Sequence, residues 1–590
     1  MWRAKRLQRM QPTCSAGRGS VDDVFRSEVS HVTQDGARVE SSPPKSFRAP
    51  QRPRAITPFA WWCVLAAVVC ASGCMVGPNY APPQVYTNPQ YQLAGNPHLQ
   101  GQPADPNVWW RYLQDPVLEQ QIDTMLQRNL TLKEAGQRVL EARARLIGVQ
   151  GNLYPQVQQV NGSYARSRLS STTANFFTFP GIFETNQNPD NWLLNFNASW
   201  ELDFWGRFRR AIESADASLG VTIAAYDDAT VLLLAETANS YVLMRTFERR
   251  LIIANQNLQY QRRVLELAKE KKAHGLATAI DVAQAEANYG QTGAMLPTLE
   301  AARRQASHRL CVLLGREPID LSAEMPPTGV IPKPVPQLAF GIPADLLRRR
   351  PDVRKAEREL AAQSARIGVA ESDFYPHISL TGNIGMQSED LSRLFTSSST
   401  AGLLSPNFSW NILNYGRIRS NVEAEKAAFQ RLCFAYRSAV LNAAKDAEDS
   451  QVNYVYAFER ANWQRIAVNG ATIAVDKGVT AYQEGASDYS RIYILQGDLL
   501  KLQDQLAATE SEIALGLVSI FRSIGGGWES RACQQLAQAG YQPTPLMTPE
   551  YVPQPAAPPS GPELVPPGQA QQPPPQQAQA YFPGAPRLIR

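Results

Sequence analysis

The chain repeats itself at an interval of about 210 residues, and this duplication constrains the fold more than any other feature. The segment WELDFWGRFR at Trp200–Arg209 returns as WNILNYGRIR at Trp410–Arg419. Upstream, IGVQGNLYP at Ile147–Pro155 returns, one residue out of step, as IGVAESDFYP at Ile367–Pro376. One copy of a duplicated unit is often unable to bury its faces alone, so the two copies must be interpreted together. Each copy has the order helix, strand, loop, strand and one very long helix, which is hard to close as a soluble monomer.

The long helices are predicted from two proline-free stretches, 206–275 and 416–485. About 67 helical residues at roughly 1.5 Å each give a rod on the order of 100 Å long. Helices of globular proteins average about 11–12 residues, so such a rod needs partners along its length. Each rod is predicted to turn at a glycine and to return over 278–315 and 488–523. Apolar residues recur at every seventh position, which indicates coiled-coil packing. These positions are Met244, Leu251, Leu258 and Leu265 in the first copy, and Tyr454, Ala461, Val468 and Val475 in the second.

An export signal precedes the repeats. Three arginines are followed by an apolar run over 59–73, which is too short for an ordinary membrane-spanning helix. The residues Ala71–Cys74 resemble a bacterial lipobox, in which the cysteine becomes the acylated first residue. A plain signal peptide with an incidental cysteine is the alternative. In bacterial lipoproteins a residue other than aspartate after the cysteine, here Met75, points to the outer membrane.

Each copy also contains two segments in which polar and apolar residues alternate. They lie at 156–168 and 192–204 in the first copy, and at 377–386 and 403–415 in the second. Alternating segments of about ten residues with aromatic ends are typical of transmembrane β-strands. The aromatic residues are Tyr164, Trp192, Trp200, Trp205, Trp410 and Tyr415. Two β-hairpins packed on helices are the alternative, but two copies in an exported chain favour transmembrane strands.

The composition argues against nucleic-acid binding. The 590 residues are 44% hydrophobic and carry a formal net charge of +5. Residues 1–73 hold 11 basic and 5 acidic residues, so the remainder has 47 basic against 48 acidic residues, a net charge of −1. A nucleic-acid-binding protein normally presents a basic field, so we predict no such partner.

The sequence also lacks motifs for catalysis and cofactor binding. The five histidines show no HExxH spacing, the seven cysteines form no CxxC pair, and there is no phosphate-binding glycine loop or nucleophile elbow. We therefore predict no catalytic residue, no metal and no cofactor. Cys311 and Cys433 lie in helical patterns and are interpreted as small buried residues.

Proline-rich segments divide the chain into successive parts. A helical pattern begins near Asp115 and ends at Tyr154, before Pro155. The predicted parts are an upstream extension with signal peptide (1–73), a lipidated extended segment (74–114), a first repeat (115–325), a linker (326–341), a second repeat (342–528) and a disordered Pro/Gln-rich tail (529–590).

The strand count requires more than one chain. Open strand edges are not tolerated in lipid, and the smallest transmembrane barrels have about eight strands. Two chains would contribute eight strands, whose interior side chains fill, whereas three would contribute twelve and leave a lumen. Rods on the order of 100 Å extend far beyond a hydrocarbon core of about 30 Å, so they must cross an aqueous space. The predicted fold is mainly α with a transmembrane β part, in which a long-helix tunnel continues the pore.

Several motifs together resemble the TolC-like outer-membrane factors, in particular the NodT-type lipoproteins of RND (resistance-nodulation-division) efflux systems. The resemblance covers about 74–528 and is clearest in LLRRRPDVRKAE at Leu346–Glu357, with CMVGPNY at Cys74–Tyr80 and GGGW at Gly525–Trp528. It implies a homotrimer with a twelve-stranded barrel in the outer membrane and a twelve-helix tunnel in the periplasm. It further implies passive efflux of drugs or other small molecules, together with a periplasmic adaptor and an inner-membrane RND transporter, and no cofactor.

The same resemblance implies a gate at the periplasmic helix turns, where acidic residues and apolar rings line a constriction. Here the turns lie at Gly275 and Gly485. In the second copy, Arg491 and Ile494 occupy positions where relatives commonly place lining aspartates. A simple ring of carboxylates is therefore not expected at those two positions.

Asp281, Asp488 and Tyr489 remain gate candidates. The competing interpretation is helix capping, since Thr278 with Asp281 three residues on resembles a capping box and Asp488 an N-cap. We hypothesise that Arg491 pairs with an acidic neighbour and holds the closed state.

Two other functions would use a similar chain. An outlet of a type I protein secretion system needs the same duct and differs only in its partners, although the Cys74 lipoprotein start favours RND efflux. A non-conducting coiled-coil scaffold predicts neither a heat-modifiable trimer nor conductance. The transported substrates are not encoded in any pattern of the sequence.

Overall fold

A computed structural model describes residues 74–84, 88, 90–93, 95–100, 102–168, 190–335, 338–339 and 348–529. All of them belong to one compact unit, Ala71–Arg590. The leader, the loop between the first two strands, parts of the linker and the Pro/Gln-rich tail beyond residue 529 lie outside the described residues.

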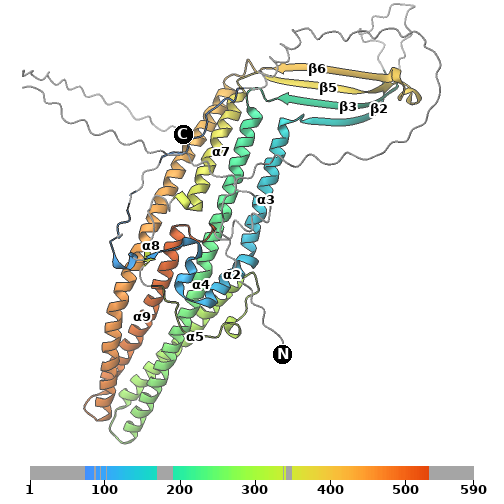
Figure 1. Cartoon of the computed structure of the whole chain (residues 1–590). Coiled ribbons are helices and arrows are strands. Elements are labelled where there is room, and N and C mark those ends of the chain that lie inside the picture. The colour runs from blue at the N-terminus through green and yellow to red at the C-terminus, as the bar shows by residue number, and fades with distance from the viewer. Residues whose placement is uncertain are drawn as a thin grey trace, which may run out of the picture. The chain divides into compact units, whose positions relative to one another are not determined.

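Two long helices form the frame of this unit (Figure 1). Helix α4 (Arg207–Ala273) and helix α8 (Arg417–Gln483) each have 67 residues. They turn back as α5 (Ala279–Leu313) and α9 (Tyr489–Ser523), each of 35 residues. The predicted rods and returns are therefore confirmed. Heptad positions such as Met244 and Tyr454 are buried between these helices.

The region 115–154 differs from the single helix that we predicted. It forms α2 (Pro116–Arg128) and α3 (Leu130–Gln150), followed by the short helix η3 (Gly151–Leu153). The break lies at Asn129, whose side chain accepts a hydrogen bond from the Leu132 amide and donates one to the carbonyl of Leu313 at the end of α5. A buried asparagine that caps α3 locally and also binds a distant carbonyl outweighs the helical periodicity around it.

Helix α7 (Pro351–Ser372) begins where the motif RPDV predicts, with Pro351 in the first turn. It packs against both long helices, α4 and α8. The Arg350 guanidinium is 2.7 Å from the Asp352 carboxylate and donates to the carbonyl of Ser523 at 2.6 Å. This arginine therefore joins α7 to the end of α9 and has a structural role.

Four antiparallel strands form one sheet in the order β2-β3-β5-β6. Their bounds are Val157–Arg166, Asp190–Leu202, His377–Ser388 and Thr400–Ser409. The two hairpins meet along β3 and β5, where Trp192 lies opposite Ser388 and Leu202 opposite Ile378. The last strand ends six residues earlier than the predicted 403–415, and residues 410–414 carry no regular structure.

The repeated tryptophans have equivalent positions in the two copies. The indole of Trp200 donates to the carbonyl of Leu153, and the indole of Trp410 donates to the carbonyl of Phe374. Each bond ties the end of a strand to the preceding helix–strand turn of the same repeat. The duplication noted in the sequence is thus a duplicated junction between sheet and helices.

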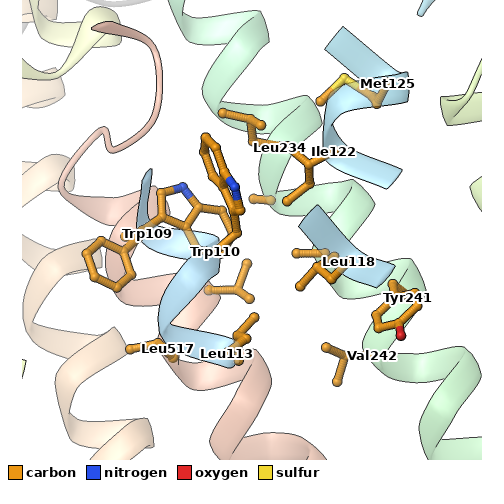
Figure 2. Close-up of a cluster of buried hydrophobic side chains, with 14 of the residues drawn as sticks. Trp109, Trp110, Leu113, Leu118, Ile122, Met125, Leu234, Tyr241, Val242 and Leu517 are labelled. Atoms are coloured by element: carbon orange, nitrogen blue, oxygen red, sulfur yellow. The ribbon is translucent and has the colours of Figure 1, made fainter. Parts of the chain in front are cut away.

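The largest hydrophobic core lies midway along the helices and includes a segment that we predicted to be extended (Figure 2). Residues Pro106–Leu113 form the 3-10 helix η2, and Trp109, Trp110 and Leu113 are buried. They pack with residues of α2, α4 and α9, among them Leu118, Ile122, Leu234 and Leu517. The predicted lipidated extended segment thus includes 74–84, which have no helix or strand, and 106–113, which are helical.

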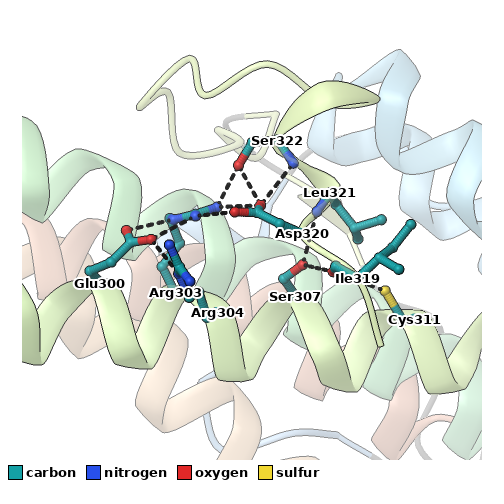
Figure 3. Close-up of polar contacts among 9 residues, drawn as sticks. All are labelled: Glu300, Arg303, Arg304, Ser307, Cys311, Ile319, Asp320, Leu321 and Ser322. Carbon is teal, nitrogen blue, oxygen red and sulfur yellow. Dashed lines mark hydrogen bonds and ion pairs between the residues drawn. The ribbon is translucent and has the colours of Figure 1, made fainter. Parts of the chain in front are cut away.

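The segment after α5 folds back onto that helix (Figure 3). The Arg303 guanidinium bridges the carboxylates of Glu300 and Asp320 at 2.9 and 3.0 Å. The thiol of Cys311 is buried and contacts the carbonyl of Ile319, as its interpretation as a buried residue predicts, whereas Cys433 is half-buried.

The linker forms a two-stranded parallel sheet with the N-terminal segment, in which β4 (Leu338–Ala339) pairs with β1 (Gln102–Pro103). Short 3-10 helices complete the structure at Pro97–Leu99, Leu321–Ala323, Leu391–Arg393 and Ser397–Ser399.

Helix α4 contains a stretch of mean hydropathy 1.4 that is long and apolar enough, by composition alone, to cross a membrane. Core helices meet the same criterion. Because α4 packs against α3, α5, α7 and α9, its apolar character is explained by contacts within the protein.

Candidate functional site

One face of the four-stranded sheet is apolar across all its strands. Paired residues of antiparallel strands point to the same face. Phe196 lies opposite Val160 of β2 on one side and Ile384 of β5 on the other. The same alternation brings further apolar residues to this face, namely Tyr164, Trp192, Leu194, Trp200, Leu380, Met386, Leu404 and Phe408.

The opposite face is mostly polar. Asn197 of β3 lies opposite Gln159 of β2 and Asn383 of β5. Side chains on this face bond to one another, since the Asn407 amide donates to the Thr381 hydroxyl at 2.8 Å. A sheet of 10- to 13-residue strands with one apolar and one polar face matches transmembrane strands that separate lipid from water.

The sheet has two open edges within the described residues. Strand β2 pairs only with β3, and strand β6 pairs only with β5. Neighbouring strands alternate in direction, so the β6 edge of one copy would meet the β2 edge of another in antiparallel orientation. The unpaired backbone N–H and C=O groups of β2 and β6 are therefore oriented so that the two edges could pair with each other between copies.

Helix α8 carries an exposed apolar stripe, which we call the α8 stripe. Its residues are Phe434, Leu441, Val452, Tyr456, Trp463, Ile466 and Ile473. At 100° per residue they all fall on one side of the helix, about opposite to the side that faces α7 and α9. Trp463 remains 74% exposed. A row of large exposed apolar side chains on one helix face is typical of an interaction surface.

The far ends of the two helix hairpins turn as the sequence predicts. Gly275 and Gly485 have positive φ of 75° and 79°, a conformation that glycine adopts without strain. At the first turn the amide of Leu276 donates to the carbonyl of Lys271, and the Gly275 amide donates to that of Lys272. This is the Schellman pattern, and the second turn repeats it.

The acidic candidates at the turns cap helices. Thr278 and Asp281 form the predicted capping box, with the Asp281 carboxylate accepting from the Thr278 amide at 2.7 Å. The Asp488 carboxylate accepts from the amide of Arg491 at 3.3 Å. Both carboxylates are thus engaged at the first turns of α5 and α9.

The other three candidates are placed differently from one another. Tyr489 is fully buried and packs against Tyr482 with ring centroids 5.9 Å apart, and burial raises its pKa to about 12. Ile494 is exposed. Arg491 is also exposed, and its guanidinium forms no ion pair with any described residue of the same protomer.

A lysine that the sequence analysis missed joins the two turns. The ammonium of Lys271, near the end of α4, donates to the carbonyls of Tyr482 and Gln483 at the end of α8. It also lies 4.5 Å from the centre of the Tyr482 ring. The last carbonyls of a helix have no partner within it and carry the negative end of its dipole, so a cation is favoured there. The partners lie more than 200 residues apart, which is why no local pattern pointed to Lys271.

We call the contact of Lys271 with the end of α8 the Lys271 latch. A small core shared by the two hairpins supports it. Val264, Leu265, Val282, Tyr482, Tyr489 and Ile492 pack together between the two hairpins. The Asn288 amide adds a bond to the carbonyl of Tyr493 at 3.2 Å. The two turns of one protomer are therefore held together as one body.

Cys74, the lipidation candidate, is exposed at the start of the described chain. Among the described residues no cluster of three or more His, Cys, Asp or Glu side chains is arranged to hold a metal ion.

Comparisons with known proteins agree with this architecture. The family model described as outer membrane efflux protein matches residues 121–316 and 342–526. Nodulation protein T of Rhizobium leguminosarum bv. trifolii is 30% identical over 450 residues, which cover 75% of this chain and 91% of that protein. The pyoverdine export outer membrane protein OpmQ of Pseudomonas aeruginosa is 30% identical, over 72% of this chain and 89% of its own. The solved structure of the outer-membrane channel OprN is 30% identical, covers 77% of this chain and all of its own, and superposes with a TM-score of 0.71.

Proposed function

Because the chain belongs to the outer membrane efflux protein family, we propose that three copies of it form a passive duct that carries small molecules from the periplasm to the exterior. The twelve strands of the trimer close into a barrel in the outer membrane. The long helices continue the lumen into the periplasm, where an adaptor protein connects the duct to an inner-membrane RND transporter.

The observation that carries this proposal is the two-faced sheet with two open edges. Its apolar face suits lipid and its polar face suits a water-filled lumen. Lipid offers no partners to the unpaired backbone groups of β2 and β6, so the edges must be paired by other copies. Eight strands would leave an interior that side chains fill, whereas twelve leave a lumen.

The helices support the same assembly. The α8 stripe lies on one flank of the protomer, and the exposed apolar residues Leu140 and Ile147 lie on α3. Helix α8 packs against α7 and α9, whereas α3 packs against α4, so the two surfaces belong to different ends of the row of helices. In a closed ring, the α8 stripe of one protomer covers α3 of the next, a heterologous contact that closes by rotation.

The membrane anchor in this proposal is acylated Cys74. Acylation would add about 0.8 kcal/mol of membrane affinity per buried CH₂. Lipidation is thus an attachment additional to the barrel.

Reconstitution tests the duct. The full chain, expressed with its own leader and purified from outer membranes, is expected to run as a heat-modifiable trimer and to conduct ions in planar bilayers. Deletion of its gene is expected to raise the sensitivity of the host to a panel of drugs, dyes and solvents. A folded monomer without conductance would exclude the duct and favour the scaffold.

We further propose that the Lys271 latch keeps the periplasmic end of the duct closed by holding the two turns of each protomer together. Opening then requires the turns of α4–α5 and α8–α9 to separate, which breaks the charge-assisted bonds of Lys271 to two carbonyls. Such bonds contribute roughly 1.5–3 kcal/mol, small enough for an adaptor to overcome.

Conductance tests the latch. Lys271→Met keeps most of the side-chain length and removes the charge, and it is expected to raise the single-channel conductance several-fold over the wild type. Arg491→Ala is the matched comparison, because it removes an exposed charge from the same region and tests the alternative that Arg491 holds the closed state. Unchanged conductance of Lys271→Met together with an open Arg491→Ala channel would exclude the latch and support Arg491.

A further inference from the structure

The residues that follow Cys74 lie in a slot between α4 and α7. The amide of Val76 donates to the carbonyl of Trp205 at 3.1 Å. Glycines make the fit close on both the wall and the segment. In the wall, a Cβ on Gly206 would lie 2.7 Å from the Met75 side chain. A Cβ on Gly77, which has a φ of +91°, would lie 2.4 Å from the Cα of Gly368. Contacts this close leave no room for larger residues, so the slot fits this segment closely.

One buried arginine holds the segment in the slot. Arg210 of α4 is 1% exposed. Its guanidinium donates to the carbonyls of Val76 and Gly77, both at 3.0 Å, and to the Asn79 side chain at 2.9 Å. A fourth bond reaches the Glu213 carboxylate at 2.7 Å. Burying a charge is costly unless it is fully hydrogen-bonded, and three of the four bonds of Arg210 go to the segment after Cys74.

The far end of the segment is attached to the second repeat. The Tyr80 hydroxyl donates to the carbonyl of Glu357 in α7 at 3.3 Å. Its ring packs on a small cluster formed by Ala217 of α4 with Ala361 and Ala362 of α7. Residues 75–80 therefore bridge a helix of the first repeat and a helix of the second.

The duplication shows that this arginine serves the segment and not the start of the long helix. Gly206 and Gly416 begin α4 and α8 in the same way, with φ of 80° and 82°. Four residues further on, α4 has Arg210 and α8 has Ser420. Among the described residues, a Cβ on Gly416 would meet nothing within 4 Å, so the start of α8 is not in close contact with a neighbouring segment and carries no arginine at this position.

From these contacts we infer that Arg210 makes residues 75–80 a rigid clip that fixes acylated Cys74 at the junction between the sheet and the helices. Cys74 is two residues from Val76, so its sulfur stays within about 7 Å plus one side chain of that point. The anchor is thus attached beside the end of β3 and does not hang on a flexible tether. The inference rests on the proposed lipidation of Cys74, and it assigns a positioning role to Arg210.

Hydrogen exchange of the full chain in lipid nanodiscs tests the clip. Arg210→Ala is expected to raise the exchange rate of the peptide covering 75–81 at least tenfold, while peptides within α5 and α9 stay unchanged. Arg209→Ala is the matched control, because the Arg209 guanidinium pairs with Asp203 at 3.0 Å. Equal exchange of 75–81 in the wild type and Arg210→Ala would overturn the clip.

A second variant and a label keep the outcomes separate. If Arg210→Ala does not fold, Asn79→Ala removes one of the acceptors of Arg210 from the segment itself and is expected to raise exchange of 75–81 several-fold. If the exchange of 75–81 in Asn79→Ala equals that of the wild type, the clip would be overturned.

Metabolic labelling with an alkyne fatty acid is expected to mark the wild type and both variants but not Cys74→Ala. Absence of label from the wild type would show that Cys74 is not lipidated. The positioning of an acyl anchor would then be overturned, whatever exchange the segment shows.

Discussion

Helices α4 and α8 have the same length, the same glycine at the start and the same turn at the end, yet their surroundings differ. Of 67 residues, 27 are buried in α4 and 13 in α8. Helix α4 packs against α3, α5, α7 and α9, whereas α8 packs mainly against α7 and α9. The duplication therefore supplied two equal rods, of which one became the centre of the protomer and the other its flank.

Residues at equivalent positions of α4 and α8 differ in burial and polarity. Ile253 of α4 is 7% exposed, whereas Trp463, 210 residues later in α8, is 74% exposed. The buried pair Arg245 and Glu248 corresponds in α8 to an apolar pair, Val455 and Phe458. The central helix has polar groups inside, where Arg245 binds the linker, and the flanking helix has large apolar groups that the described residues leave exposed.

The largest expected effect comes from placing a glutamate at equivalent positions of α4 and α8, which should disturb folding in one case and assembly in the other. Ile253→Glu buries an unpaired carboxylate and is expected to prevent folding of the protomer. Trp463→Glu, at the equivalent position of α8, is expected to leave a folded protomer that no longer forms trimers. Light scattering coupled to size exclusion measures the mass, and circular dichroism measures the helix content. A normal trimer of Trp463→Glu would show that the α8 stripe is not an interface.

The next effect concerns the buried polar network of α4. Arg245 pairs with Glu248 at 2.9 Å and donates to the carbonyl of Pro326 in the linker. Arg245→Met leaves Glu248 as an unpaired buried charge and is expected to cost about 3–5 kcal/mol. In α8, Val455→Ala removes only apolar contact and is expected to cost about 1–2 kcal/mol. The melting temperature in detergent should fall further for Arg245→Met, and equal shifts would contradict the different roles of the two positions.

The smallest expected effect is a dependence of stability on pH that arises at Asp227 of α4 and has no counterpart at the equivalent position of α8. Burial raises the pKa of Asp227 to about 7 despite its bond to Arg354, whereas α8 has the exposed Arg437 at the equivalent position. A carboxyl whose pKa is higher in the folded than in the unfolded state, about 3.9, stabilises the fold when protonated. This contribution is full below about pH 4 and is lost as the pH rises through about 7. The melting temperature of the wild type should therefore decline from pH 5 to pH 8 more steeply than that of Asp227→Asn, and parallel profiles would refute this assignment.

Much of the fold could be predicted from local patterns. The absence of proline and the two glycines defined both 67-residue helices, and period-two alternation located all four strands of the larger sheet, although not β1 and β4. The glycines that end the rods located the two turns, where Thr278 and Asp488 cap the returning helices. The break at Asn129 and the helix at 106–113 were missed because each depends on contacts with distant helices.

The sequence by itself determined the rods and the hairpins and led to the proposal of several chains, because helix length, strand alternation and strand number are properties of neighbouring residues. Only the tertiary structure decided which of the two equal rods is central and which side of α8 the described residues leave uncovered. It alone showed that Lys271 reaches the end of the other long helix and that Arg210 holds the segment behind Cys74. Those contacts join residues more than 130 positions apart, and their energies depend on burial and geometry, which no periodicity along the chain records.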